Sequence, residues 1–262
     1  MRILLAGGTG MIGRALARTL IEKGNAVWVL TRRDALMGMP PGIRLSKWDG
    51  KTVRGWSDAA EWAQVIVNLA GENVGAGRWT EARKQAIRSS RVDAGQAIVR
   101  AIEAGARPSL LVQASAIGYY GTRQFDTPLN ENFPVGEDFL AQVCREWEES
   151  TVSAERQGIR RVILRTGLVL GRDEGVLRRM ALPFRLFAGG RLGSGQQWLS
   201  WIHLQDEVEA ICFLIEGMKE GVFNLTSPQP VVQQVFGKIL AKVMRRPYWL
   251  PAPAFALRFV LG

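Results

Sequence analysis

Short strand-like segments alternate with longer amphipathic ones along the first part of the chain. Six segments have the apolar content or alternation of strands, and they occupy residues 2–6, 26–30, 43–48, 65–70, 110–114 and 161–165. Between them, apolar positions recur every three or four residues, which predicts helices over residues 11–23, 80–104 and 136–157. Strands joined by crossover helices form parallel sheets, so the pattern predicts an α/β protein with a Rossmann-type, doubly wound parallel sheet of six strands.

The pattern changes beyond the sixth of these segments, where strand and helix signals become short and mixed. Glycines gather in residues 189–195 and prolines in residues 247–253. We therefore predict a dinucleotide-binding domain over residues 1–165 and a smaller lobe over residues 166–262, partly interleaved with it, that covers the substrate at the open end of the sheet. Residues 254–262 are apolar and helix-like with no element after them to pack against, so we expect the lobe to be incomplete at its C-terminal end.

The charge balance is basic and bears on the partners. The chain has 262 residues, with 34 Lys and Arg against 24 Asp and Glu, which is a formal net charge of +10. The basic residues are scattered in singles and pairs, so we expect no nucleic-acid partner, although an anionic small molecule would be attracted. No apolar run approaches the roughly 20 residues that cross a bilayer, which predicts no membrane partner and a cytoplasmic location.

The residues that bind metals or form disulfides are few. Cys144 and Cys212 cannot make a disulfide framework, and His203 is the only histidine, so we predict no metal site. We interpret His203 as a residue between a strand and a helix with a structural hydrogen-bonding role.

The strongest motif is the glycine-rich turn over residues 7–13, which follows the first predicted strand and opens the first predicted helix. Gly7, Gly10 and Gly13 have the spacing G-x-x-G-x-x-G, and Gly8 with the last two satisfies G-x-G-x-x-G. Glycines there allow a tight turn, a close approach to a pyrophosphate and close packing of the helix on the strand. The helix N-terminus then offers free N–H groups to the phosphates, so the motif predicts a dinucleotide cofactor.

The residues after the second predicted strand indicate which dinucleotide is bound. Arg32 and Arg33 lie where an acidic residue would bind the ribose hydroxyls of NAD, or an arginine the 2′-phosphate of NADP. Because a guanidinium matches phosphate oxygens in bidentate geometry, the two arginines favour NADP. NAD is the less favoured alternative, since Asp34 could turn back to a ribose.

Further motifs lie at or after the later strands. They are Asn68-Leu69-Ala70-Gly71-Glu72-Asn73 with Gly77-Arg78-Trp79-Thr80, Ser115-Ala116-Ile117-Gly118-Tyr119-Tyr120-Gly121, Trp147-Glu148, Arg165-Thr166-Gly167 and Trp201-Ile202-His203. Over essentially the whole chain, these motifs and the glycine turn resemble the extended branch of the short-chain dehydrogenase/reductase superfamily. They are most similar to its atypical NAD(P)-dependent, sugar-nucleotide-epimerase-like family. The resemblance implies an oxidoreductase or epimerase for a small carbonyl or sugar-like substrate, and suggests a homodimer.

The resemblance also implies a role for particular residues. The residues that would hold the pyrophosphate are Gly7, Gly10, Met11, Ile12 and Gly13. Thr9 would cap the turn, and Leu69-Ala70-Gly71 would pass under the nicotinamide ribose. Asp49 would accept a hydrogen bond from the adenine amino group, or else form an Asx turn with Gly50. Ser115 stands in the place of the catalytic serine that hydrogen-bonds the reacting carbonyl or hydroxyl.

One departure from the superfamily concerns its catalytic Tyr-x-x-x-Lys pair, in which lysine and cofactor lower the tyrosine pKa for acid–base work. None of the three tyrosines, Tyr119, Tyr120 and Tyr248, has lysine four residues later. Near the expected place on the helix stand Phe139 and Val143, which cannot transfer a proton.

Three explanations are compatible with this departure. Tyr120 could act as acid or base together with Ser115. Another group, such as Glu72 tuned toward neutrality or Cys144, could replace the tyrosine. Alternatively, the protein binds NADP(H) without catalysis, as a regulatory or redox-sensing protein.

Overall fold

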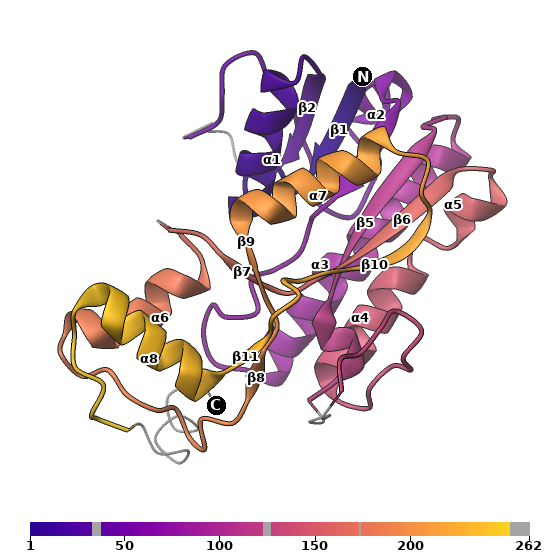
Figure 1. The fold of residues 1–262 in the computed structure, drawn as a ribbon. Helices are drawn as coiled ribbons and strands as arrows, with labels where there is room; N and C mark the ends of the chain where they lie inside the picture. Colours follow the sequence, from indigo (N-terminus) through magenta and orange to yellow (C-terminus); the bar gives the residue numbers. More distant parts are fainter. Residues whose placement is uncertain (33–37, 123–126, 173, 252–262) are drawn as a thin grey trace.

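The computed structural model describes residues 1–32, 38–122, 127–172 and 174–251 of the chain. At its centre is a seven-stranded parallel sheet with the order β10-β6-β5-β4-β1-β2-β3 (Figure 1). Its strands are β1 (Arg2–Ala6), β2 (Ala26–Thr31), β3 (Arg44–Lys47), β4 (Val65–Asn68), β5 (Leu110–Ala116), β6 (Arg160–Thr166) and β10 (Gly221–Leu225). This is the Rossmann-type, doubly wound α/β fold that the hydrophobic pattern predicts.

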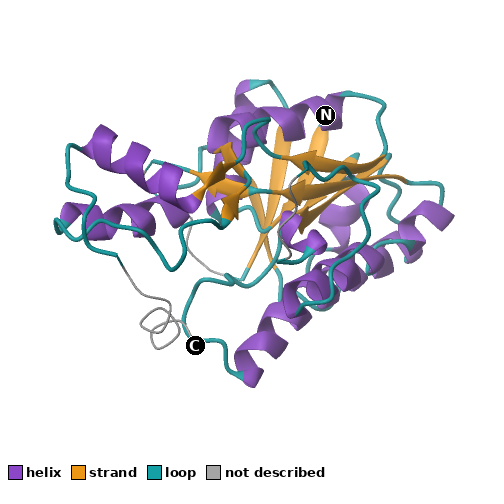
Figure 2. Cartoon of the chain, turned by 60° about the horizontal axis from the view of Figure 1, so that its bottom comes forward, coloured by secondary structure: helices purple, strands orange, loops and turns teal. Residues whose placement is uncertain are grey.

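Helices cover both faces of the sheet (Figure 2). One face carries α1 (Met11–Glu22) and α7 (Leu204–Glu216), and the other carries α2 (Ser57–Trp62), α3 (Glu81–Glu103), α4 (Phe139–Glu149) and α5 (Ser153–Arg156). The strand order reverses between β1 and β4, and the carboxyl ends of these two strands therefore border the crevice where ligands of such sheets bind.

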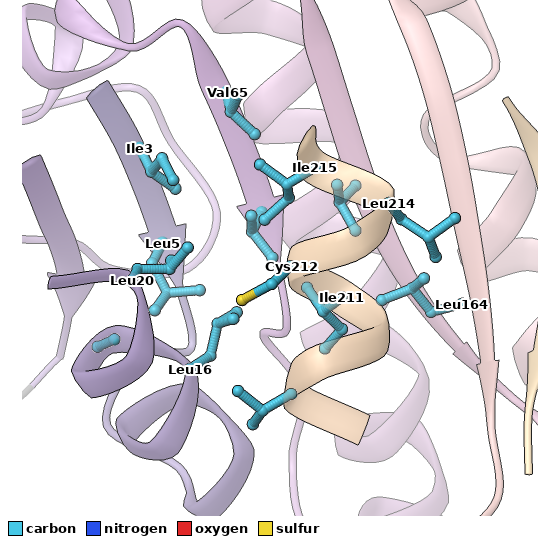
Figure 3. Close-up of a cluster of buried hydrophobic side chains, with 14 of the residues drawn as sticks. Ile3, Leu5, Leu16, Leu20, Val65, Leu164, Ile211, Cys212, Leu214 and Ile215 are labelled. Carbon is cyan, nitrogen blue, oxygen red and sulfur yellow. The ribbon is translucent and has the colours of Figure 1, made fainter. Parts of the chain in front are cut away.

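The core has one apolar layer on each face of the sheet. On the first face, Leu16 and Leu20 of α1 and Ile211 and Ile215 of α7 pack against buried strand residues such as Leu5 (Figure 3). On the second face, a separate cluster of buried residues from α2 and α3 packs against the same strands. Because parallel strands are buried on both faces, their sequences are nearly continuous apolar runs, and this is why the pattern identified them.

The sheet has one strand more than the six predicted. The additional strand, β10, pairs in parallel with β6 at the edge of the sheet, with Phe223 opposite Leu164. Most of its residues are only half-buried, so it lacks the apolar run that marks a central strand. Both β10 and α7 come from residues beyond 166, so the later part of the chain completes the sheet and covers it.

The single helix predicted over residues 136–157 is two helices in the structure, α4 and α5. Asp138 caps α4 by accepting a hydrogen bond from the N–H of Ala141. After α4 ends, the hydroxyls of Ser150 and Thr151 donate to carbonyls of the preceding turn. Such side-chain bonds compete with the helical ladder, which explains the break.

The remaining residues beyond 166 form a smaller lobe. It contains β7 (Leu168–Leu170) paired with β9 (Trp201–His203), β8 (Trp198–Leu199) paired with β11 (Val231–Val232), and the helices α6 (Val176–Arg185) and α8 (Gln233–Met244). Helices α6 and α8 lie to one side of the sheet, away from its strands (Figure 1). Residues 254–262, for which a helix-like stretch is predicted, lie outside the described residues.

Gly95 of α3 gives a test of how closely the helices pack. A Cβ at this position would lie 2.9 Å from the Ser150 Cβ, next to the break between α4 and α5. We therefore expect Gly95→Ala to lower the free energy of unfolding in urea by about 1–3 kcal/mol through overpacking. Adding Ser150→Gly should recover part of the loss, because it removes the clashing atoms. A Gly95→Ala variant as stable as the wild type would contradict this packing.

Candidate cofactor and substrate site

The glycine turn brings the ends of β1 and β4 into close contact. Gly7 has a φ of +78°, and a Cβ there would lie 2.6 Å from the Leu69 carbonyl carbon. A Cβ on Gly13 would lie 2.5 Å from the Gly7 carbonyl oxygen. The N–H of Leu69 also donates to the Ala6 carbonyl over 2.9 Å. Side chains are therefore sterically excluded at Gly7 and Gly13, as the motif requires.

The N-terminus of α1 opens directly from the turn. Its N-cap is Gly10, and no side chain caps it, so the N–H groups of the first turn keep their capacity for a ligand. This corrects the expectation that Thr9 caps the turn, because the cap position falls one residue later, on a glycine. Thr9 instead offers its carbonyl to the Arg14 guanidinium. Glycines that admit a close approach, together with an uncapped helix start, fit a dinucleotide diphosphate.

Arg32 stands at the end of β2 with an exposed side chain. Its Nη2 lies 3.7 Å from Oε2 of Glu72, which follows β4. The hydrogen bond from Arg83 to Glu72 lowers the pKa of Glu72, with Arg32 adding to this effect. Glu72 is therefore held in its charged form, opposite to the neutral form needed for it to replace the tyrosine. Arg33 and Asp34 lie outside the described residues.

Asp49 follows β3 and closes a local turn. Its Oδ1 accepts hydrogen bonds from the N–H groups of Lys51 and Thr52 at 2.8 Å each. These backbone bonds, that of Thr52 above all, lower the pKa of Asp49. The contacts of Asp49 within the chain are therefore those of the Asx-turn alternative.

The Leu69-Ala70-Gly71 segment lies between the glycine turn and α3. A Cβ on Gly71 would lie 3.1 Å from the guanidinium carbon of Arg91, so this segment is in close contact with that side chain. The Arg91 guanidinium donates to the carbonyls of Glu72 and Ile87. The structure therefore brings this segment beside the glycine turn and holds its far end against α3.

Ser115 belongs to a buried polar network between β5, α4 and β6. Its Oγ donates to Oε1 of Glu148 over 2.6 Å. Arg165 donates from Nε to the same oxygen over 2.9 Å and from Nη2 to Oε2 over 3.0 Å. Ser115 and Arg165 are each only 3% exposed. A buried pair with this bidentate geometry is highly directional, so it fixes Ser115 relative to α4.

Tyr120 joins the same network from the 3-10 helix η1 (Ile117–Tyr120). Its hydroxyl donates to Oδ1 of Asn224 over 2.6 Å and accepts from Nη1 of Arg165 over 3.1 Å. The Arg165 guanidinium also lies 3.4 Å from the ring centroid of Tyr119. Burial by itself would lower the pKa of Arg165. Its hydrogen bonds to Glu148 and Tyr120 outweigh that effect, so the pKa lies above the ordinary value and Arg165 stays charged.

The network contains three residues that the sequence did not identify as site residues. Glu148 and Arg165 stand in motifs typical of the superfamily, but no spacing along the chain shows that they pair with each other. Asn224 comes from β10, the strand that the hydrophobic pattern missed.

The place expected for the Tyr-x-x-x-Lys pair holds two aromatic rings with a lysine ammonium beside one of them. The ring centroids of Phe139 and Trp79 are 5.7 Å apart, and Nζ of Lys84 lies 5.8 Å from that of Phe139. Burial raises the pKa of the nearby Cys144 thiol to about 11, so this thiol is neutral and does not serve as a base at neutral pH.

Two further residues lie where β6 and β9 meet α7. Nδ1 of His203 accepts a hydrogen bond from the N–H of Gln205 and so caps α7, in agreement with a structural role. Glu207 in the next turn is 1% exposed and accepts a hydrogen bond from the Thr166 hydroxyl over 2.8 Å. Its other oxygen has no hydrogen-bond partner, and burial raises the pKa of this carboxyl to about 7.

A pocket of about 530 Å³ opens beside Tyr120. It lies between η1, the described residues 121–122 and 127–129, β10, and the segments around β8 and β11 in the smaller lobe. The residues that line it are Ile117, Tyr120, Gly121, Thr122, Thr127, Pro128, Leu129, Gln197, Trp198, Ser200, Asn224, Thr226 and Pro230. Ser115 is not among them, so the structure brings Tyr120 but not Ser115 to the pocket wall.

Within residues 1–32, 38–122, 127–172 and 174–251, no helix has both the length and the apolar content to cross a membrane. The same ranges contain no cluster of three or more His, Cys, Asp or Glu side chains placed to hold a metal ion.

The protein belongs to the extended short-chain dehydrogenases/reductases. Its doubly wound sheet has a glycine turn suited to a diphosphate at the switch point, and a serine lies at the end of the fifth strand. Comparison with known proteins makes the assignment specific. The model of the NAD dependent epimerase/dehydratase family matches residues 3–226, and the chain belongs to that family. The family resemblance in the sequence is thereby confirmed.

Several relatives match over the whole of this chain and over more than three quarters of their own length. The chain is 40% identical over 272 residues to the chloroplastic epimerase family protein SDR39U1 homolog of Arabidopsis thaliana, covering 100% of this chain and 76% of that protein. It is 39% identical over 271 residues to the epimerase family protein YfhF of Bacillus subtilis, covering 100% and 86%. The crystal structure of human epimerase family protein SDR39U1 (isoform 2) with NADPH matches with a TM-score of 0.85 at 30% identity, covering 100% and 86%.

The raised pKa of Glu207 predicts a pH-dependent stability. Because the folded pKa lies above the ordinary value of 4.5, this carboxyl stabilises the fold in its protonated form. The stabilisation is full below pH 4.5 and is lost as the pH rises through about 7, which amounts to about 3 kcal/mol. In urea unfolding, Glu207→Gln should lose less stability than the wild type over this window, while the exposed control Glu61→Gln should follow the wild type. A parallel pH profile for Glu207→Gln would contradict the assignment.

Proposed function

We propose that the protein is an NADP-dependent oxidoreductase or epimerase acting on a small carbonyl or sugar-like substrate. The substrate is held between the open end of the sheet and the lobe formed by residues 166–262. The observation that carries the proposal is the close backbone approach at Gly7 and Gly13, where a side chain would not fit, with the guanidinium of Arg32 at the end of the neighbouring strand β2. The NADPH in the human relative supports the choice of cofactor.

The residues that bind the cofactor follow from this geometry. The turn from Gly7 to Gly13, with Thr9, Gly10, Met11 and Ile12, accommodates the pyrophosphate at the uncapped start of α1. Arg32 and Arg33 recognise the 2′-phosphate, and Asp49 meets the adenine. The segment Leu69-Ala70-Gly71 supports the nicotinamide ribose. When bound, the cofactor would supply a hydride to a substrate carbon or accept one from it, while the attached oxygen gains or loses a proton.

In the proposed mechanism, Ser115 forms a hydrogen bond with that oxygen and Tyr120 transfers its proton. The Ser115 proton is directed at Glu148, so its oxygen is oriented to accept a hydrogen bond from a substrate hydroxyl. Tyr120 is the proton donor, and its hydroxyl leaves Asn224 to reach the substrate in the pocket. Arg165 is a positioning residue, because its ion pair with Glu148 holds it against the phenol oxygen.

The second candidate function is that of a non-catalytic NADP(H)-binding regulatory or redox-sensing protein. Phe139 and Val143 near the place of the missing Tyr-x-x-x-Lys pair favour it. The two functions differ in one readout, the absorbance of NADPH in the presence of a panel of carbonyl compounds. A fall in absorbance supports the enzyme, and binding of NADPH without oxidation across the panel supports the regulator.

We further propose that the protein works in the cytoplasm on a small molecule and forms a homodimer, as the family suggests. Light scattering of the purified protein tests the assembly, and fractionation of the source cells tests the compartment.

Arg32 provides a test of cofactor choice. A charge-assisted hydrogen bond to the 2′-phosphate contributes about 1.5–3 kcal/mol, so we expect calorimetry to show wild-type binding of NADPH at least about tenfold tighter than NADH. Arg32→Ala should lose most of this preference for NADPH, and Arg33→Ala measures how much of the preference Arg33 contributes. The control Arg54→Ala, an exposed arginine on another loop, should retain it. Equal affinities for the two cofactors in the wild type would refute the NADP assignment.

Tyr120 and Ser115 provide a test of the catalytic roles. Tyr120→Phe should lower turnover about 100-fold or more, as expected for loss of a general acid, with NADPH affinity nearly unchanged. Ser115→Ala should lower turnover in the same direction. The matched control is Tyr119→Phe, which keeps the aromatic ring over Arg165 and should retain turnover. Wild-type turnover in both Tyr120→Phe and Ser115→Ala would remove these residues from the mechanism.

A further inference from the structure

The pocket beside Tyr120 is lined by uncharged side chains over its described residues. Its polar groups are hydroxyls and amides, among them those of Ser200, Asn224 and Thr226. Apolar surface comes from residues such as Leu129 and Trp198. At about 530 Å³, the pocket has the size of a typical small-molecule site. Hydroxyls and amides of this kind both donate and accept hydrogen bonds, so they suit a neutral, hydroxylated ligand.

Within the described residues, Arg165 and Glu131 are the charged groups behind the pocket that contact its lining, and both already have partners in the protein. Arg165 is 3% exposed, and its guanidinium donates to the Glu148 carboxylate, the Tyr120 hydroxyl and the Glu131 carbonyl. The Glu131 carboxylate accepts a hydrogen bond from the N–H of Asn224. A phosphate could recruit Arg165 only by breaking a buried ion pair, and leaving Glu148 without its partner would be strongly destabilising.

This distribution of charge discriminates between classes of substrate. A phosphate or diphosphate loses hydration when it enters a pocket, and without a countercharge that loss is not compensated. Hydroxyl and carbonyl groups lose less, and hydrogen bonds to Ser200, Asn224 and Thr226 can replace their hydration. The described lining therefore favours a neutral ligand over a nucleoside diphosphate sugar.

Trp198 offers a flat apolar surface at the same pocket. Its side chain is 51% exposed even though its backbone is held in place. Val232 of β11 pairs with Trp198, and the N–H of Gln233 donates to the Gln197 carbonyl over 2.8 Å. Sugar rings carry an apolar face of C–H groups and a rim of hydroxyls. An indole beside hydroxyl and amide groups is complementary to both features.

We infer that the substrate is an uncharged, hydroxyl-rich carbonyl compound or its alcohol, of the free sugar class, whose ring lies on Trp198 and which carries no phosphate. The inference rests on the proposed function, because it takes this pocket as the substrate-binding part of the NADP-dependent site.

The experiment is titration of the NADPH-saturated protein, followed by tryptophan fluorescence and calorimetry. The probes are a set of neutral aldoses, ketoses and polyols, together with glucose 1-phosphate and UDP-glucose. We expect at least one neutral probe to bind more tightly than both anionic ones. Trp198→Ala should weaken that neutral probe about tenfold, through the loss of the aromatic contact, without changing NADPH affinity. The matched control Trp249→Ala removes a tryptophan that is 67% exposed on the same lobe outside the pocket, and it should bind like the wild type.

Each result has a distinct meaning. Tighter binding of glucose 1-phosphate or UDP-glucose would overturn the inference, and loss of that binding in Arg123→Ala would trace it to a cation outside the described residues. Absence of binding by every neutral probe, or equal effects of Trp198→Ala and Trp249→Ala, would overturn it as well. Calorimetry with NADPH alone precedes these titrations, and failure of the protein to bind NADPH there would instead overturn the proposed function itself.

Discussion

The contact between the backbones of Gly7 and Leu69 is the constraint on which the arrangement of the site depends. Two neighbouring parallel strands end there without side chains between them, and the chain turns directly into the uncapped start of α1. Any Cβ at Gly7 would push β1 and β4 apart at the switch point of the sheet. The same close approach places the helix N-terminus, the end of β2 and the segment after β4 around one crevice, and this makes the fold suited to a dinucleotide.

A second constraint acts at the other side of the site. The buried pair of Arg165 and Glu148 links β6 to α4, and it holds the hydroxyls of Ser115 and Tyr120 by direct hydrogen bonds. Removing one charge would leave the other buried without a partner, so the loss of either residue would be strongly destabilising. In this chain the network involves Tyr120 of η1 rather than a tyrosine on α4. The guanidinium of Arg165 therefore lies directly behind the phenol that we propose as the proton donor.

The pocket shows how function is divided between the two parts of the chain. Residues before 166 provide the cofactor crevice and Tyr120, while Trp198, Ser200 and Thr226 come from later in the chain. Because β10 joins the large sheet and β8 pairs with β11, the later residues that line the pocket are held in place by strand pairing. Among the described residues, the cation directly behind the pocket, Arg165, is engaged in an ion pair with Glu148.

The sequence alone determined the doubly wound fold and the glycine turn. Buried parallel strands leave apolar runs, and only glycine tolerates the angles and contacts of the turn, so both features can be recognised locally. The tertiary structure alone decided the edge strand β10, the break between α4 and α5, and the pairing of Ser115, Glu148, Arg165 and Asn224. It also decided the pKa values of two carboxyls, of which that of Glu72 is lowered and that of Glu207 is raised. These features depend on half-buried backbone, on partners distant in sequence and on burial, none of which leaves a periodic pattern along the chain.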